Sequence, residues 1–221
     1  MIRSGATFQD RREAGRELAA ALQRFKDARP IVLALPRGGV PVGYEVAKAL
    51  GAPLDVLLVR KIGVPGQEEL ALGAVVGGAN PQTVLNEEIV QVVGPLPGYV
   101  EAERERQLVE IERRRRVYRG DEPPLDMAGR TVIVVDDGIA TGATVKAALR
   151  GIALNAPQRT ILAVPVAPRE ALNELASACD EIVCLASPDP FYAVGAHYAD
   201  FSQTSDEEVV RLLAAARAPA G

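Results

Sequence analysis

The chain has 221 residues, 48% of them hydrophobic, which is enough for one sizeable core with a small accessory part. Its formal net charge of −4 disfavours a nucleic-acid-binding surface, because binding to phosphates requires a basic footprint. Two cysteines and one histidine are too few for a structural zinc site, and no apolar run reaches the ~18 residues of a membrane span, so we expect a cytoplasmic protein that binds no membrane.

Short apolar runs alternate with helix-like segments along most of the chain. This alternation predicts an α/β fold with a doubly wound parallel sheet. Residues 60–72 are rich in glycine and proline, and we expect a long loop there. Strands are predicted at residues 31–35, 54–59, 73–76, 131–135, 160–164 and 181–185, and helices at residues 10–28, 40–50, 86–93, 99–118, 144–154, 169–178 and 205–216.

We expect residues 1–221 to form a single domain. Residues 80–124 depart from the alternating pattern and are predicted to be a helical insertion. Residues 187–204 are irregular and aromatic, and they are predicted to form a small hood at the C-terminal end. Ser205 then precedes the last helix as its N-cap, with Glu208 at the position of a capping box.

Two aspartates follow the strongest predicted strand. Residues 132–135 are all β-branched, which is typical of a strand buried on both faces. Asp136 and Asp137 come directly after them, at the sheet edge where ligands bind in open α/β folds. Carboxylates repel phosphate, but they suit hydroxyl groups or a hard cation such as Mg²⁺.

The segment after these aspartates has the composition of a phosphate-binding turn. Main-chain N–H groups at a helix start bind a phosphate well, and Gly142 allows the backbone to approach it closely. Thr141 and Thr144 add hydroxyl donors. The alternative is an ordinary strand–turn–helix with capping residues, but four apolar residues, two acids and Ala-Thr-Gly-Ala-Thr form a more specific combination.

Residues 132–144 resemble the phosphoribosyl pyrophosphate-binding signature of type I phosphoribosyltransferases. The resemblance implies that Asp136 and Asp137 contact the ribose hydroxyls and take part in binding Mg²⁺. It also implies that the 5′-phosphate is held by the five residues Ala140, Thr141, Gly142, Ala143 and Thr144.

Residues 36–39 resemble the pyrophosphate loop of the same family, with Arg37, Gly38 and Gly39 as the binding residues. In the family this loop can contain a cis peptide bond between non-proline residues, and the Pro36–Arg37 bond is the candidate here. A simple Pro-Gly turn is the alternative interpretation of these residues taken alone.

Arg60 and Lys61 end a predicted strand and resemble the Arg-Lys pair before the mobile catalytic loop of adenine phosphoribosyltransferases. Two cations suit a pyrophosphate leaving group, on which charge builds up as the bond to ribose breaks. Glu68 and Glu69 lie in the corresponding loop and are candidates for acid–base work. The alternative is a surface pair beside a turn.

The predicted hood contains four of the nine Phe and Tyr residues. Aromatic faces stack on planar bases, and Tyr192 stands two residues before a Val-Gly pair, as an aromatic does in hypoxanthine-guanine phosphoribosyltransferases. Phe191 and Tyr192 are therefore candidate base-binding residues, and a packed lid without a ligand role is the equal alternative. His197 is predicted to pack within this lid rather than to act as a catalyst.

The resemblance as a whole implies an enzyme of nucleotide metabolism. It would bind phosphoribosyl pyrophosphate with Mg²⁺ and transfer the phosphoribosyl group to a nitrogenous base, releasing pyrophosphate. In 6-oxopurine enzymes the residue three after the second acid is an aspartate, whereas here it is Ala140, which argues against a 6-oxopurine acceptor. Residues 8–15, 67–75 and 198–209 resemble a bacterial group of such proteins but imply no particular substrate.

The alternative function is a non-catalytic regulatory protein that binds phosphoribosyl pyrophosphate. Known regulators of this fold need a nucleic-acid-binding surface or an added domain, and an acidic chain without a visible helix-turn-helix extension ranks that alternative second. In either case the expected partners are small molecules. The acceptor base and the oligomeric state stay open, with a homodimer as one arrangement.

Overall fold

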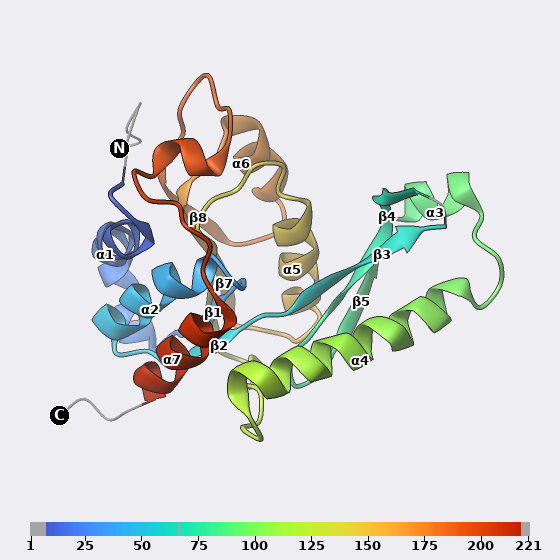
Figure 1. Ribbon diagram of the computed structural model, residues 1–221, viewed down its shortest axis with the longest axis horizontal. Helices are drawn as coiled ribbons and strands as arrows, with labels where there is room; N and C mark the ends of the chain where they lie inside the picture. Colours follow the sequence, from blue (N-terminus) through green and yellow to red (C-terminus); the bar gives the residue numbers. More distant parts are fainter. Residues whose placement is uncertain (1–7, 66, 218–221) are drawn as a thin grey trace.

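The computed structural model describes residues 8–65 and 67–217, with the backbone alone described over 67–70, and its centre is a five-stranded parallel sheet. The strand order is β2-β1-β6-β7-β8 (Figure 1). The predicted doubly wound parallel sheet is therefore confirmed. Its strands are β1 (Ile31–Ala34), β2 (Leu54–Val56), β6 (Thr131–Val135), β7 (Arg159–Val166) and β8 (Glu181–Ala186).

Both faces of this sheet are covered by helices, because successive side chains of each buried strand point to opposite faces. In β6, Ile133 and Val135 pack into one core cluster, and Val132 and Val134 pack into the other. One face is covered by α1 (Arg11–Leu22), α2 (Gly39–Leu50) and α7 (Asp206–Arg217), and the other by α5 (Ala143–Ala153) and α6 (Arg169–Leu175).

A second, three-stranded antiparallel sheet projects from the parallel sheet, and we call it the arm together with its two helices (Figure 1). Its strand order is β3-β4-β5, and in Figure 1 helix α4 runs along it from the tip back to the parallel sheet. The arm consists of β3 (Val59–Val64), β4 (Gln67–Val76), β5 (Gln82–Leu85), α3 (Glu87–Val93) and α4 (Tyr99–Arg119).

The prediction of a long loop over residues 60–72 is wrong, because these residues form most of the β3–β4 hairpin. Pro65 lies in the turn after β3, and register shifts lie on either side of Gly63, so these two residues mark a turn and an irregular strand rather than an open loop. The predicted insertion at residues 80–124 contains the two expected helices, but it also supplies strand β5, which pairs with β4.

The arm is fixed to the body of the protein by close packing and by one buried ion pair. A Cβ atom on Gly151 of α5 would lie 2.6 Å from a methyl carbon of Val76, so α5 approaches β4 closely. Arg119, the last residue of α4, makes a 2.8 Å salt bridge with Asp55 of β2, and both side chains are almost completely buried. Burial raises the pKa of Asp55 and lowers that of Arg119, and their mutual attraction opposes both shifts.

The C-terminal hood is irregular, as predicted, apart from a 3₁₀ helix at Val194–His197. Phe8 pairs with Tyr198 in an isolated parallel bridge, so the start of the described chain lies against the hood. The expected cap of the last helix is present, because the Glu208 N–H donates to Ser205 Oγ at 3.2 Å. No helix within residues 8–65 and 67–217 is long and apolar enough to cross a membrane.

Candidate functional site

The two predicted acids lie side by side at the carboxyl end of β6. The Asp137 N–H donates to Asp136 Oδ1 at 2.9 Å. Burial, and secondarily the charge of Asp137, raises the pKa of Asp136 well above its usual range. The pair therefore carries less negative charge than two free carboxylates would, and its remaining oxygens can accept hydrogen bonds from ligand hydroxyls.

The predicted pyrophosphate loop lies directly against these acids. Ala34 of β1 pairs with Val135 of β6, so the segments that follow the two strands emerge next to each other. A Cβ atom on Gly38 would lie 2.0 Å from Asp137 Oδ2, and one on Gly39 would lie 2.8 Å from the Val135 carbonyl oxygen. The loop needs glycine at both positions for this approach. The Pro36–Arg37 peptide bond is cis, as expected.

Arg37 extends from this loop toward the start of α7 rather than toward the acids. Its guanidinium lies 3.7 Å from a carboxylate oxygen of Asp206, which also accepts a 2.7 Å hydrogen bond from the Tyr118 hydroxyl of α4. Burial and this bond raise the pKa of Tyr118 to about 12, so the phenol remains a donor at neutral pH. Arg37 therefore has a protein partner in this conformation.

Arg11 contacts the second acid, and sequence reasoning missed it. Its Nε donates to Asp137 Oδ2 at 2.7 Å, and the two side chains are only 12% and 14% exposed. The segment that contains Arg11 stood out in the sequence, but nothing in it indicated a contact across 126 positions of the chain.

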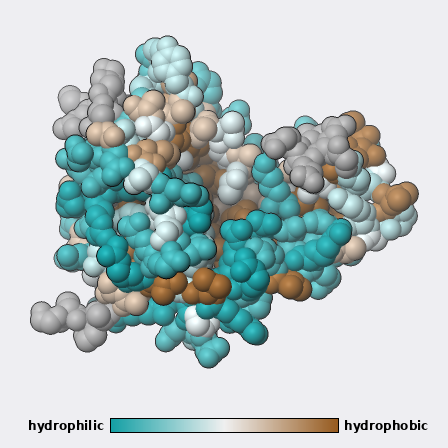
Figure 2. Space-filling view, viewed as in Figure 1, coloured by the Kyte–Doolittle hydropathy of each residue, from teal (hydrophilic) through white to brown (hydrophobic). Residues whose placement is uncertain are grey.

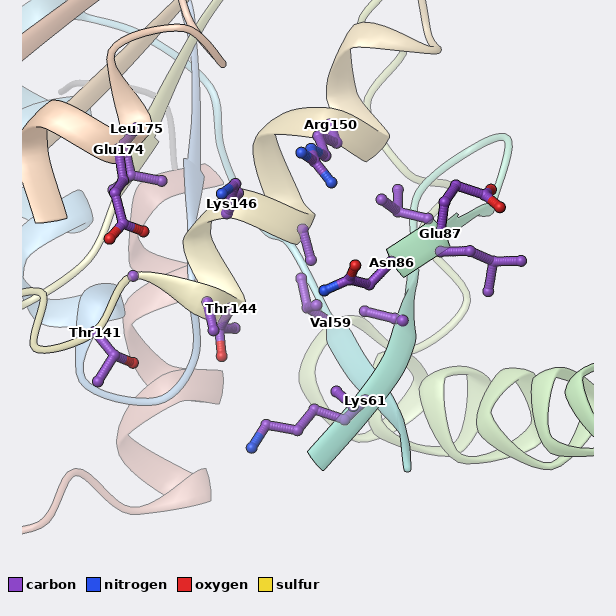
Figure 3. A pocket seen from close by; sticks show the side chains of 18 of the residues that line it. Val59, Lys61, Asn86, Glu87, Thr141, Thr144, Lys146, Arg150, Glu174 and Leu175 are labelled. Atoms are coloured by element: carbon purple, nitrogen blue, oxygen red, sulfur yellow. The ribbon is translucent and has the colours of Figure 1, made fainter. Parts of the chain in front are cut away.

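The predicted 5′-phosphate loop opens helix α5 and lines one wall of a cleft of about 530 Å³. Gly142 has a φ of 76°, a left-handed conformation that favours glycine, and α5 begins at the next residue. Thr141 and Thr144 are exposed to the cleft (Figure 3). The arm forms the opposite wall, so the cleft separates the phosphate loop from strands β3, β4 and β5.

The structure separates the predicted pair Arg60 and Lys61. Neighbouring residues of a strand point to opposite faces, so only one of the two faces the cleft. Arg60 Nε donates to Gln107 Oε1 of α4 at 2.9 Å, whereas Lys61 lines the cleft and extends toward the wall that carries Thr144 (Figure 3). The side chains of Glu68 and Glu69 lie outside the described part of the structure.

The hood packs on the loop after the acids. A Cβ atom on Gly138 would lie 2.4 Å from a methyl carbon of Val194. Phe191 stacks on His197 with ring centroids 5.4 Å apart, so this histidine packs in the hood as predicted. Tyr192 is 83% exposed.

The hydropathy surface shows that polar side chains cover most of the face turned to the viewer, with apolar residues gathered at the lower edge and on the arm (Figure 2).

The donor set suits a Mg²⁺ ion that is held partly by a substrate. No group of three His, Cys, Asp or Glu side chains within the described ranges is arranged to hold a metal ion. Asp136 and Asp137 each use one carboxylate oxygen for a protein hydrogen bond, which leaves oxygens for further contacts. Mg²⁺ is commonly bound by one or two carboxylates together with substrate phosphates and water, and these two residues fit that mode.

Comparisons with known proteins agree with this arrangement. A family model described as "Phosphoribosyl transferase domain" matches residues 7–199. Rv0571c of Mycobacterium tuberculosis, provisionally named a phosphoribosyl transferase, is 47% identical over 206 residues, which are 93% of this chain and 46% of that protein. The bifunctional protein PyrR of Chloroflexus aurantiacus is 33% identical over 137 residues, which are 58% of this chain and 65% of that protein.

Among solved structures, TT1426 from Thermus thermophilus is similar throughout, with a TM-score of 0.83, 45% identity, and coverage of 94% of this chain and 97% of that one. The chain spans about half the length of the curated mycobacterial relatives that it matches. The family match covers the glycine loop, the acids, the phosphate loop and most of the hood. The chain belongs to the phosphoribosyl transferase domain family.

Proposed function

We propose that the chain is an enzyme that binds phosphoribosyl pyrophosphate with Mg²⁺ and transfers the phosphoribosyl group to a nitrogenous base other than a 6-oxopurine. The observation that carries this proposal is the meeting of two loops, one after β1 and one after β6, at one sheet edge. The acid pair lies against Gly38, and helix α5 begins six residues after Asp137. A ligand with a pyrophosphate and a phosphate on either side of a diol matches this order: the glycine loop, the acid pair and the start of α5.

Each part of the substrate has a matching part of the site in this proposal. The 5′-phosphate is bound by N–H groups and hydroxyls at residues 140–144. The ribose 2′- and 3′-hydroxyls donate to Asp136 and Asp137. The pyrophosphate is bound by backbone groups of residues 37–39, with Arg37 leaving Asp206 to pair with it. That exchange is favourable because a 3.7 Å contact between partly exposed groups is weak.

The reaction breaks the bond between ribose C1 and the pyrophosphate oxygen, whose electron pair leaves with pyrophosphate, and forms a bond from C1 to a nitrogen of the base. Mg²⁺, when bound, offsets the negative charge on the leaving group. Arg37 and Lys61 are the protein cations proposed to stabilise the same charge. Phe191 and Tyr192 are proposed to contact the base, and transient closure of residues 60–72 is proposed to exclude water. Glu68 or Glu69 is proposed to accept the proton that the base loses as the bond to C1 forms.

The decisive experiment measures pyrophosphate release from phosphoribosyl pyrophosphate and Mg²⁺ with a panel of nucleobases. Release that requires one base supports the proposed transferase. Tight binding by calorimetry without release for any base supports the alternative, a regulatory protein. Absence of both binding and release contradicts the proposed site.

A further inference from the structure

The N-terminal segment (residues 8–11) and the C-terminal segment (residues 197–202) are joined by main-chain hydrogen bonds. The Phe8 N–H donates to the His197 carbonyl at 2.8 Å, and the Ala199 N–H donates back to the Phe8 carbonyl at 2.8 Å. A third bond runs from the Asp200 N–H to the Gln9 carbonyl, also at 2.8 Å. The two segments, far apart in the sequence, are therefore joined along their main chains.

Arg11, the last residue of the N-terminal segment, connects these joined segments to the acid pair. Its Nη1 donates to the Ser202 carbonyl at 2.7 Å, while its Nε donates to Asp137. The guanidinium carbon lies 3.9 Å from the centre of the Phe201 ring, within the range of a cation–π contact. One planar group thus contacts the C-terminal segment at two points and the second acid at a third.

Tyr198 makes a second connection between the same parts. Its hydroxyl donates to the Asp137 main-chain carbonyl, and burial raises the pKa of this tyrosine, so it remains a donor. Its ring lies 5.1 Å from that of Phe201 and 5.5 Å from that of Phe8, measured between centroids. The C-terminal segment therefore contacts both the backbone of Asp137, through Tyr198, and its side chain, through Arg11.

We propose that Arg11 is a positioning residue, which holds Asp137 in the orientation that accepts the ribose hydroxyls and couples binding of a ribose phosphate to the order of the C-terminal segment. This inference rests on the proposed function, because it takes the ligand to be a ribose phosphate. Its physical basis is the geometry of the guanidinium. A lysine ammonium has all its N–H groups on one nitrogen and no planar face, so it cannot contact Asp137 and Ser202 from two separate nitrogens while stacking on Phe201.

The chain offers a matched control on the same helix. Arg12 follows Arg11, makes a 3.2 Å salt bridge with Glu45, and lies 5.7 Å from the Tyr44 ring. Arg12→Met therefore removes a cation, a salt bridge and a ring contact from α1 without touching the acid pair. Arg11→Met and Arg11→Lys are the test variants, and the second retains a cation that can still donate a hydrogen bond to Asp137.

The first measurement is calorimetry with ribose 5-phosphate and with inorganic phosphate. For Arg11→Met we expect the affinity for ribose 5-phosphate to fall by about 10- to 100-fold, as for a lost hydrogen bond to a charged group, with the affinity for phosphate unchanged. Arg12→Met should match the wild type for both ligands. Equal loss for both ligands indicates a merely structural role and overturns the inference, as does no loss for either.

The second measurement is hydrogen exchange at the Ala199 and Asp200 amides, with mass-spectrometric detection. Without ligand, exchange should be faster in Arg11→Met than in Arg12→Met. Ribose 5-phosphate should slow it in the wild type, but in neither Arg11 variant, although Arg11→Lys should keep most of its affinity.

Ligand protection that is equal in the wild type and Arg11→Lys overturns the coupling. A wild-type protein that binds neither ribose 5-phosphate nor phosphoribosyl pyrophosphate overturns the proposed function and this inference together. Normal wild-type binding with unaffected Arg11 variants overturns only the inference.

Discussion

Gly38 and Asp137 are in such close contact that a Cβ atom on residue 38 would lie 2.0 Å from the Asp137 carboxylate oxygen. The same oxygen, Oδ2, accepts the hydrogen bond from Arg11. The loop after β1 and helix α1 thus confine one carboxylate from two sides, and a substitution on either side should be detectable in ligand binding.

Gly38→Ala should weaken binding of phosphoribosyl pyrophosphate by about 5- to 150-fold, because relieving this overlap costs roughly 1–3 kcal/mol in shifted atoms. Calorimetry measures the effect. Gly51→Ala is the matched control, since Gly51 has a φ of 64° and open space around its Cβ position. It should lower the free energy of unfolding by about 1 kcal/mol with binding intact. Unchanged affinity in Gly38→Ala would contradict the assignment of the pyrophosphate loop.

Thr141→Ala should weaken phosphate binding at the start of α5 by roughly 1–3 kcal/mol, the value of a lost hydrogen bond to a charged group. The affinity for ribose 5-phosphate is the measurement. Thr83→Ala removes a threonine hydroxyl that accepts a bond from Arg104 on the arm, and it should bind like the wild type. Equal affinities in the two variants would mean that residues 140–144 do not hold the phosphate.

Arg119→Met should lower the free energy of unfolding by about 3–5 kcal/mol, because it leaves Asp55 buried without its counter-charge. Replacing both members, as Asp55→Asn with Arg119→Met, should restore much of this loss, since no uncompensated charge remains buried. Urea unfolding of the two single variants and the double variant measures the coupling. If the losses of the single variants simply add, the pair is not acting as an ion pair.

Cys184 should react slowly with iodoacetamide in the folded protein. Burial raises the pKa of its thiol to about 11, and the thiol points to the Ala186 carbonyl oxygen at 3.1 Å. The neutral form is favoured by burial, so the reactive thiolate is scarce below that pH. The alkylation rate, followed by mass spectrometry, should rise continuously from pH 8 toward pH 11. In urea the rate should instead level off near pH 9, and a plateau near pH 9 in the folded protein would contradict the shift.

Hypoxanthine and guanine should be poor acceptors, because Ala140 stands where 6-oxopurine enzymes have an acid and alanine cannot exchange a proton with the base. Steady-state assays with each base test this expectation. Turnover of either at an ordinary enzymatic rate, about 1 to 10³ s⁻¹, would refute it. Activity toward whichever base does react should be present with alanine at position 140 and should not depend on Ala140→Asp. Loss of Glu68 and Glu69 together should impair that activity.

The parallel sheet could be predicted because β6 is a continuous run of buried β-branched residues and its neighbours β1 and β7 are short, almost entirely buried runs, as expected of strands covered on both faces. The arm could not be predicted in full. Its strands are less uniformly apolar, and the glycine and proline of the hairpin also suit a loop. Pairing with β5 stabilises β4 through contacts distant in sequence, and local propensity does not report such contacts.

The acids and the phosphate loop could be predicted because they are contiguous in sequence. The role of Arg11 could not be predicted, because it depends on how α1 packs against the sheet and on the path of the C-terminal segment. The signal that was available is the pairing of two unexplained motifs, residues 8–15 and 198–209, which the fold brings into contact at Phe8 and Tyr198.

The opposite orientations of Arg60 and Lys61 constrain how the length of the arm can vary. Arg60 of β3 donates a hydrogen bond to Gln107 of α4, and Lys61 faces the cleft. A one-residue change just before this pair that shifts the pairing of β3 with β4 would exchange their directions, so that the lysine faced α4 and the arginine faced the cleft. A shift by two residues would keep both directions. Length changes between β2 and Lys61 should therefore be tolerated where the connection after β2 absorbs them and the pairing of β3 with β4 is kept.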